Sequence, residues 1–222
     1  FVQSCDKGCG HQATAALTAE NAPYTGSAIE TAKITYSGSE WLGDKPSLTY
    51  ADNTEAGTAT ATMTLADKTV SVNFTVEKAE AGVTHPTAKA LTYTGKAQTL
   101  ITEGAAQHGT ISYRLGDGEW GQTLPAATAV GSYKVFYKVE PVSANYAAVE
   151  ATEIAAGIAA APITGVSVTA KPVTYTGSVH TPEVETAATT VDGAQVSFAY
   201  STAADSTYGD LPSFTEAGNH TV

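Results

Sequence analysis

Cysteine is nearly absent from this sequence of 222 residues: only Cys5 and Cys9 occur, both near its start. The rest of the chain must therefore fold without disulfides. Long apolar runs are also lacking, and even the Ala-rich stretch 155–162 is far shorter than the ~18 to 20 residues that a membrane helix needs. Basic residues are few, with 11 Lys and Arg against 22 Asp and Glu, and the net charge of −11 argues against a nucleic-acid-binding surface.

Signatures of catalysis are lacking as well. The sequence contains no Gly-x-Ser-x-Gly motif and no phosphate-binding loop, and no local motif for catalysis by a Ser or Cys nucleophile with a histidine. Acidic residues cluster only in predicted turns, where Asp, Asn and Gly are favoured for local reasons, and none of the clusters matches a calcium-binding loop. The sequence therefore predicts a protein that is not an enzyme and carries no cofactor.

Small residues are abundant: 39 Ala, 35 Thr and 20 Gly make up 94 of the 222 residues. Many of them belong to an internal repeat marked by the tripeptide Tyr-Thr-Gly, which occurs at 24–26, 93–95 and 175–177. Each copy is followed by a short segment in which apolar, polar and aromatic residues alternate, at 34–36, 111–113 and 196–198. Strict alternation is typical of a half-buried strand, and the turn residues that follow predict hairpins at 37–39 and 116–118.

Each copy continues with a proline and then with a glycine that opens another strand. These glycines are Gly57, Gly131 and Gly218. In the second copy the alternation places Tyr133, Val135, Tyr137 and Val139 on one face of that strand. In the first copy the strand is followed by a turn and a second alternating segment, 70–76.

The repeats predict an all-β fold of tandem, small, immunoglobulin-like β-sandwich domains in an elongated array. We assign 1–12 to a Cys-containing entry segment, 13–79 to repeat 1, 80–162 to repeat 2 and 163–222 to repeat 3. Repeat 3 has no counterpart of the strands that finish the first two repeats, so we expect it to be incomplete at its C-terminal end. An unfinished sandwich leaves an open edge that favours pairing with another chain. The segments 77–81 and 157–162 are the expected linkers.

Two segments of the second repeat, 91–98 and 129–135, resemble MBG-type immunoglobulin-like repeats. Such repeats are common in giant secreted or wall-anchored proteins of Gram-positive, Firmicutes-like bacteria. The segment 5–17 resembles a Cys-containing entry strand found ahead of similar repeats. The resemblance implies an extracellular location at the cell surface or cell wall, and it implies no catalytic residues.

Cys5 and Cys9 are the candidate disulfide. Together with His11 they are also half of the four-ligand set that a structural zinc site needs, but no second ligand pair is visible. A disulfide ranks ahead of free or intermolecular thiols, and these rank ahead of a metal, if the protein is exported to an oxidising compartment.

Three aromatic residues, Trp41, Trp120 and Tyr113, are candidate ligand contacts, because exposed aromatic rings together can form a platform on which sugars stack. Their recurrence at matching places in successive repeats favours a structural role as core or cross-strand residues. An intramolecular Lys-Asn isopeptide bond is an alternative for lysines on or near predicted strands, with Asn73 and Asn145 as partners, but solvated edge lysines are the favoured interpretation. The lysines concerned are Lys33, Lys96, Lys134 and Lys138.

The sequence thus predicts a non-enzymatic extracellular stalk segment, structural or adhesive. Two alternatives remain open: a binding module for a host glycan or host protein such as mucin or an immunoglobulin, and a fibre subunit completed by a strand from a neighbouring chain. The expected partners are host glycans or proteins, neighbouring copies, or adjacent domains of the same large protein. Neither nucleic acid nor membrane insertion is expected.

Overall fold

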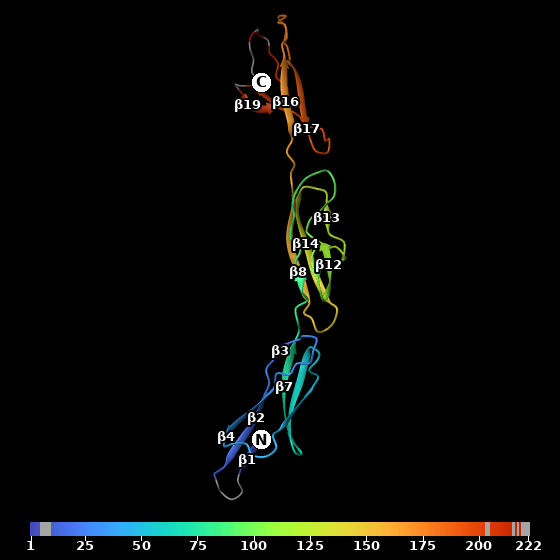
Figure 1. Ribbon diagram of the computed structural model, residues 1–222. Helices are drawn as coiled ribbons and strands as arrows, with labels where there is room; N and C mark the ends of the chain where they lie inside the picture. Colours follow the sequence, from blue (N-terminus) through green and yellow to red (C-terminus); the bar gives the residue numbers. More distant parts are fainter. Residues whose placement is uncertain (5–9, 203–204, 215, 217, 219–222) are drawn as a thin grey trace. The chain divides into compact units, whose positions relative to one another are not determined.

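The computed structural model describes residues 1–4, 10–202, 205–214, 216 and 218, and these residues form an all-β structure (Figure 1). None of the described residues belongs to a helix that is long and apolar enough to cross a membrane. The chain packs as two compact units. Unit 1 contains Phe1–Thr87, Thr102–Leu124 and Lys134–Ile154, and unit 2 contains Ala88–Ile101, Pro125–Tyr133 and Ala155–Val222. Repeat 1 lies within unit 1, repeat 3 lies within unit 2, and repeat 2 contributes to both. The tandem immunoglobulin-like arrangement stays a prediction.

Repeat 1 contains two sheets. The larger has the strand order β3-β7-β6-β5 and consists of β3 (Ala22–Pro23), β7 (Lys68–Glu77), β6 (Gly57–Leu65) and β5 (Ser47–Ala51). The pair β3–β7 is parallel, whereas the other pairs are antiparallel. The smaller sheet has the order β1-β2-β4 and consists of β1 (Val2–Ser4), β2 (Gln12–Thr18) and β4 (Lys33–Gly38). The entry segment thus contributes a strand of its own.

The hairpin expected at 37–39 is wrong. Strand β4 pairs with β2, which precedes it in the sequence, so residues 37–39 do not connect two paired strands. The partner of β6 is instead β5, in which Tyr50 lies opposite Ala61. In repeat 2 the strand beside β14 is β12, in which Tyr113 lies opposite Tyr137. Ala61 lies four residues after Gly57 and Tyr137 lies six residues after Gly131, so the two tyrosines differ in register by two residues. Both repeats place a tyrosine-containing antiparallel strand here, and the sequence match to 34–36 selected the wrong segment.

Small side chains make the core of repeat 1 thin. Ala59, Ala61 and Met63 lie on one face of β6 and are completely buried, as alternation requires. Phe74 of β7 packs against Ala59 and Ala61 and makes an edge-to-face contact with Tyr50, with 6.3 Å between ring centroids. A few aromatic rings thus supply the bulk that the alanines lack.

Repeat 2 is organised around β14 (Gly131–Pro141), which pairs antiparallel with β12 (Gly109–Leu115). Val135, Tyr137 and Val139 are buried on one face of β14, so the alternation predicted for this strand is confirmed. Strand β15 (Val149–Ala159) continues the sheet, and its last three residues pair parallel with β9 (Ala90–Thr92). Residues 157–159 are therefore part of a strand, and the linker expected there is shorter.

The remaining strands are short, apart from one antiparallel pair in repeat 3. In unit 1, β8 (Val83–Thr84) pairs with β11 (Ala105–Ala106). In unit 2, β10 (Gln98–Thr99) pairs with β13 (Ala126–Ala127). Repeat 3 contains the pair β16 (Thr164–Lys171) with β17 (Glu183–Thr189) and the pair β18 (Tyr200–Thr202) with β19 (Asp205–Gly209).

At two glycine positions of the repeat, the three copies share the backbone conformation as well as the amino acid. The glycines of the Tyr-Thr-Gly tripeptides have left-handed φ angles of 82°, 74° and 83° at Gly26, Gly95 and Gly177. The glycines expected to open a strand have φ angles of 150°, 153° and 156° at Gly57, Gly131 and Gly218. Residues with a side chain rarely adopt either conformation, which explains why both positions are glycine.

Candidate functional site

Asn145 forms the centre of the contact between repeats 1 and 2, which lies within unit 1. It is only 6% exposed and is the one buried polar side chain among the described residues. Its Nδ2 donates to the carboxylate of Glu55, and its Oδ1 accepts from the backbone N of Ala56 at 2.8 Å. Its own carbonyl accepts from the backbone N of Ala79 at 2.9 Å. A buried amide whose donor and acceptor groups are used in this way fixes the two repeats relative to each other.

Aromatic rings extend this contact, which we call the first inter-repeat contact. Tyr24 of repeat 1 meets Tyr146 of repeat 2 edge to face, with 5.7 Å between centroids. Tyr146 also stacks on His108, with centroids 4.2 Å apart and planes inclined by only 10°. The expected linker 77–81 is packed into the same region, because Ala81 is 1% exposed and Ala79 forms a parallel bridge with Tyr146.

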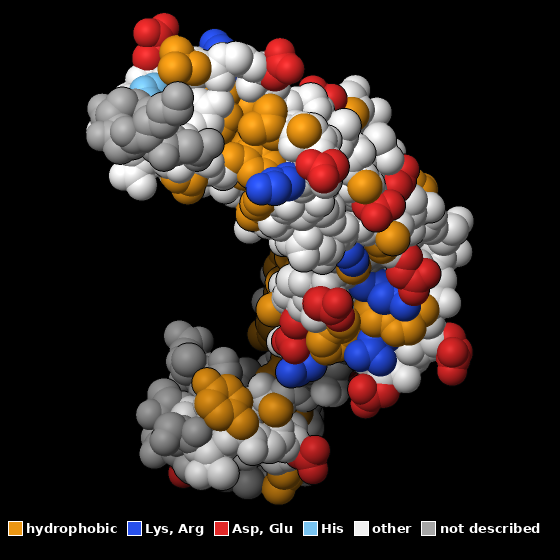
Figure 2. Space-filling model, turned by 90° about the horizontal axis from the view of Figure 1, so that it is seen from below, with side chains coloured by type: hydrophobic (Ala, Val, Ile, Leu, Met, Phe, Trp, Pro, Cys, Tyr) orange, Lys and Arg blue, Asp and Glu red, His pale blue; other side chains and the backbone are white. Residues whose placement is uncertain are grey.

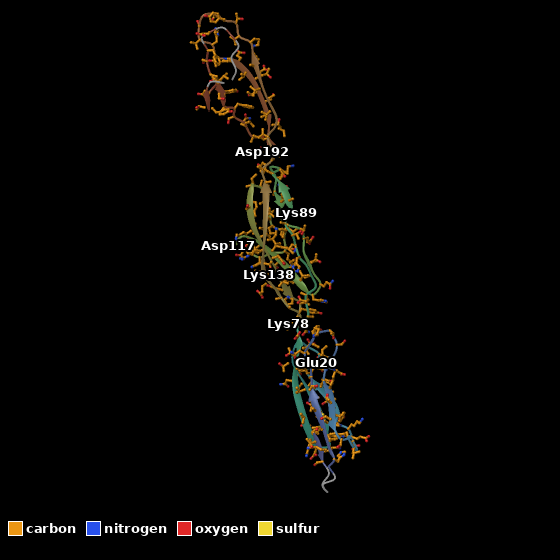
Figure 3. The ribbon with its side chains drawn as sticks, turned by 90° about the vertical axis from the view of Figure 1, so that its left-hand side faces the viewer. Glu20, Lys78, Lys89, Asp117, Lys138 and Asp192 are labelled. Atoms are coloured by element: carbon orange, nitrogen blue, oxygen red, sulfur yellow. The ribbon has the colours of Figure 1, made fainter. Side chains whose placement is uncertain are left out.

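The second inter-repeat contact joins repeats 2 and 3 within unit 2. The hydroxyl of Tyr93 donates to Oδ2 of Asp192 at 2.8 Å, and Oδ1 of Asp192 accepts from the backbone N of Ala194 at 3.2 Å. The hydrogen bond from Tyr93 is the main cause that lowers the pKa of Asp192, and the same bond raises the pKa of Tyr93. Asp192 is labelled in Figure 3.

Both contacts use the same position of the repeat. Tyr24 and Tyr93 are the tyrosines of the first two Tyr-Thr-Gly tripeptides, and each touches the following repeat. The third such tyrosine, Tyr175, is 56% exposed. Sequence reasoning found the tripeptide but interpreted it only as a marker of the repeat. Its recurrence was one signal in the sequence that pointed to these contacts. Glu55 lies in a second repeated motif, Thr-Glu-Ala-Gly at 54–57 and 215–218, whereas Tyr146 and Asp192 belong to neither motif.

Trp120 belongs to a cluster of cations and rings at the surface of repeat 2. The guanidinium of Arg114 lies between two rings, 4.9 Å from the centroid of Trp120 and 4.7 Å from that of Phe136. Nζ of Lys138 lies 5.0 Å from the centroid of Trp120. We call these four residues the Trp120 cluster. On the face shown in Figure 2, Lys and Arg side chains lie beside hydrophobic ones, while acidic side chains are spread more widely.

The other two candidate aromatic residues differ from Trp120. Tyr113 is 3% exposed, and its hydroxyl accepts from the backbone N of Gly104 at 2.9 Å, so it is a core residue that a ligand does not reach. Trp41 is partly exposed, meets Tyr36 edge to face at 5.5 Å and donates through Nε1 to the carbonyl of Asp44 at 2.9 Å. The three residues therefore do not form one platform.

The lysines and asparagines considered for an isopeptide bond do not meet in the described structure. Lys134 pairs with Glu153 at 3.2 Å, and Lys138 pairs with Glu140 at 2.6 Å. Oδ1 of Asn73 accepts from the hydroxyl of Thr60, and Asn145 is committed to the first inter-repeat contact. The side chain of Lys134 is 70% exposed and forms the solvated pair that the alternation of β14 predicts, whereas that of Lys138 is only 29% exposed.

The candidate disulfide, Cys5 and Cys9, lies outside the described residues. Among the residues that are described, no group of three or more His, Cys, Asp or Glu side chains can hold a metal ion.

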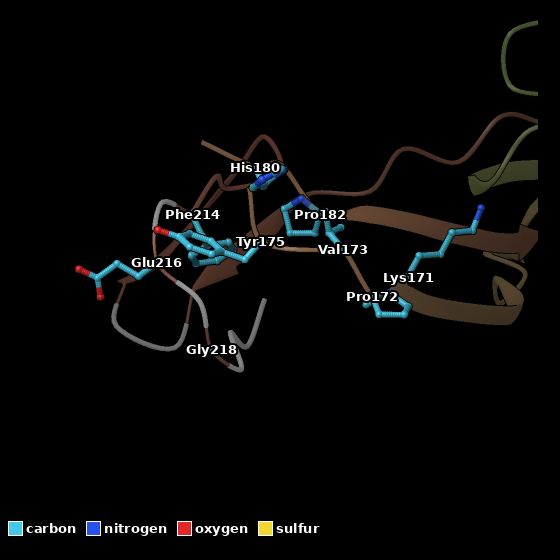
Figure 4. Close-up of a pocket in the computed structure, with 10 residues that line it drawn as sticks. Lys171, Pro172, Val173, Tyr175, His180, Pro182, Phe214, Glu216 and Gly218 are labelled. Atoms are coloured by element: carbon cyan, nitrogen blue, oxygen red, sulfur yellow. The ribbon is translucent and has the colours of Figure 1, made fainter. Parts of the chain in front are cut away.

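Repeat 3 contains a pocket of about 600 Å³ (Figure 4). Its apolar wall includes Val173, Tyr175, Pro182 and Phe214, and His180 adds a polar group. The pocket therefore lies beside the third Tyr-Thr-Gly tripeptide.

No family model matches this chain, and no curated protein matches it either.

Proposed function

We propose that this chain is a non-enzymatic segment of an extracellular stalk, structural or adhesive, at the surface or in the wall of a bacterial cell. In this proposal each repeat is an immunoglobulin-like β-sandwich, similar to the MBG-type repeats. Neighbouring copies, or adjacent domains of the same large protein, are its structural partners.

The observation that supports a stalk best is the first inter-repeat contact. A flexible tether needs no buried hydrogen bonds between its domains, whereas here Asn145 bonds to Glu55 and Ala56 across the two repeats. The intervening segment is packed at Ala81 rather than free. Such a contact limits bending between repeats, which is the property a spacer requires.

Small-angle scattering of the whole chain tests this proposal. A compact chain of 222 residues has a radius of gyration of about 17 Å. A stalk predicts a clearly larger value, together with a pair-distance distribution that has one short main peak and a long tail. Dispersed amide NMR signals show that the chain is folded in the same sample. A folded chain with a radius near that of a compact globule overturns the stalk. Antibody labelling of intact producing cells tests the extracellular location separately.

The Trp120 cluster supports a second candidate function, the binding of a host glycan or host protein. A tryptophan face supplies a stacking surface for a sugar ring, while Arg114 supplies positive charge on a chain whose net charge is −11; Lys138 lies beside the same ring but is paired with Glu140. This combination fits an acidic glycan or an acidic protein segment better than a neutral sugar.

A glycan array and a panel of host proteins test this binding, with Trp120→Ala as the variant. Trp41→Ala is the matched control, since Trp41 is partly exposed but lies in repeat 1. Binding that Trp120→Ala abolishes and Trp41→Ala retains supports the candidate. If no ligand binds reproducibly, or if Trp120→Ala and Trp41→Ala bind a ligand equally well, the Trp120 cluster is not a binding site.

A further inference from the structure

In repeat 3 the extended segment 172–175 lacks, among the described residues, the partner strand that the matching segments of repeats 1 and 2 have. In repeat 1 the backbone N of Tyr24 donates to the carbonyl of Glu77 at 2.8 Å, and in repeat 2 the backbone N of Tyr93 donates to the carbonyl of Ala159 at 2.8 Å. In both repeats the acceptor lies on the last strand of the repeat. Tyr175 is the counterpart of these tyrosines, and no carbonyl of a described residue accepts from its backbone N.

The side chains of this segment are correspondingly uncovered. Two residues before the tyrosine, Ala22 pairs with buried Val76, and Leu91 pairs with buried Ile158. The counterpart in repeat 3 is Val173, which is 48% exposed, and the following Tyr175 is 56% exposed. Apolar side chains in this state lose the free energy that burial would contribute, about 25 cal/mol per Å² of apolar surface.

Elsewhere in the pocket of repeat 3, the backbone pairing is the same as in repeats 1 and 2. Five residues after the repeat tyrosine, the backbone N of Ile29 donates to the carbonyl of Asn53, and Gln98 pairs antiparallel with Ala127. In repeat 3 His180 and Phe214 form the equivalent antiparallel bridge, with both N-to-O distances close to 2.9 Å. The 600 Å³ pocket lies between this bridge and the segment 172–175 (Figure 4).

Repeat 3 also has the counterpart of the glycines that open β6 in repeat 1 and β14 in repeat 2, the strands that we call the covering strands. Gly218 lines the pocket, and its φ of 156° matches the 150° of Gly57 and the 153° of Gly131. Gly57 is the first residue of β6 and Gly131 is the first residue of β14. The backbone at Gly218 therefore has the conformation from which a covering strand starts in the other two repeats.

We propose that the pocket of repeat 3 is the binding site of a β-hairpin that continues the same polypeptide from Gly218. Its second strand runs parallel to residues 172–175, places an aliphatic side chain opposite Val173 and accepts a hydrogen bond from the backbone N of Tyr175. The required pattern is the one that β7 and β15 show, with buried side chains two residues apart: Phe74 and Val76 in the first, Ala156 and Ile158 in the second. The same polypeptide is the source because Gly218 itself lines the pocket that the hairpin fills. The proposal concerns the fold of repeat 3 and does not depend on the extracellular function.

Grafting tests this inference on the whole chain. One variant carries residues 58–77, the β6–β7 hairpin of repeat 1, directly after Gly218 in place of residues 219–222. A second carries residues 132–159, the β14–β15 hairpin of repeat 2. We expect either graft to slow hydrogen exchange at the Tyr175 amide at least tenfold, because that amide gains its acceptor. Two grafts of different sequence guard against one that fails to fold, and failure of both to protect Tyr175 overturns the proposal.

A matched control uses the same 58–77 graft with each apolar residue of its second strand exchanged with its polar neighbour. The composition is then unchanged, but the apolar side chains face away from the pocket. This graft should not protect Tyr175, and equal protection contradicts the proposed register. Val173→Glu should remove the protection given by the native graft, whereas Val179→Glu should not, because Val179 is 64% exposed and does not line the pocket. If the unmodified chain instead dimerises with Tyr175 protected, a second copy occupies the pocket and the proposal is wrong.

Discussion

Asn145 and Glu55 are 90 residues apart in the sequence, yet the side-chain amide of Asn145 donates directly to the carboxylate of Glu55. Replacing Asn145 with Ala removes the hydrogen-bond partner of the exposed Glu55 carboxylate and of the half-buried backbone N of Ala56. We expect Asn145→Ala to lower the free energy of unfolding by about 1 to 3 kcal/mol, because two hydrogen bonds are lost and each contributes about 0.5 to 1.5 kcal/mol. Denaturant unfolding monitored by circular dichroism measures this loss.

Asn73→Ala is the control for that variant. Asn73 is exposed and its side chain makes a hydrogen bond to the hydroxyl of Thr60. Its replacement should change stability by no more than about 0.5 kcal/mol, as for most surface substitutions. Equal losses in the two variants would show that the first inter-repeat contact contributes no special stability.

The hydrogen bond between Tyr93 and Asp192 makes the second inter-repeat contact sensitive to pH at both extremes. The pKa of Asp192 is lowered from 3.8, so its stabilising contribution is complete above that value and is lost as the pH falls through the lowered pKa. The pKa of Tyr93 is raised from 10.0, so its contribution is complete below that value and is lost as the pH rises through the raised pKa. The contact should therefore be constant across the neutral range.

An NMR titration checks this behaviour through the amide signals of residues 93–95 and 190–194. We expect one transition below the ordinary pKa of an aspartate and another above that of a tyrosine. Asp192→Asn should remove the acid transition and bring the pKa of Tyr93 back toward 10.0. An unchanged alkaline transition in that variant would show that Tyr93 does not donate to Asp192 in solution.

Tyr113→Phe should be destabilising even though the two side chains have nearly the same shape. The lost hydroxyl is the acceptor for the backbone N of buried Gly104. We expect a loss of about 1 to 2 kcal/mol in denaturant unfolding because this N–H is left without a partner. Tyr208→Phe is the matched control, since Tyr208 is 72% exposed and should tolerate the change. A loss of the same size at Tyr208 would contradict this explanation.

Gly131→Ala tests the backbone conformation that opens β14. Its φ of 153° is one that residues with a side chain rarely adopt, and we expect a cost of about 1 to 3 kcal/mol in thermal or denaturant unfolding. Gly121→Ala provides the comparison, because Gly121 does not have such a φ and an added Cβ there meets nothing within 4 Å. If both variants are equally stable, the glycine at 131 is not required for its conformation.

The all-β class and the faces of the strongly alternating strands could be predicted from the sequence. In β14 the large residues Val135, Tyr137 and Val139 occur at every second position, and this leaves one way to bury them. Strand β15 was harder to predict, because alanine carries little information about which face is buried. Its Ala-rich stretch was expected to contain a linker, whereas 157–159 pair with β9.

The partner of a strand was less predictable than the strand itself. The segments 34–36 and 47–50 both alternate and both end in a tyrosine, so the local pattern does not decide which of them lies beside β6. Pairing depends on contacts between segments far apart in the sequence, and here β5 is the partner. The inter-repeat contacts were missed for the same reason, since Asn145 and Glu55 become significant only when two repeats meet.

The parallel pairing of β9 with the end of β15 has a mechanical consequence. These segments lie near the beginning and the end of repeat 2, and their backbones are joined side by side at Ala90, Leu91 and Thr92. A force that pulls the ends of the repeat in opposite directions slides the two strands along each other, so the hydrogen bonds between them must break together rather than one after another. Forced unfolding is governed by the rate of such a step. The parallel pairs β3–β7 in repeat 1 and β9–β15 in repeat 2 thus resist extension of these repeats under force.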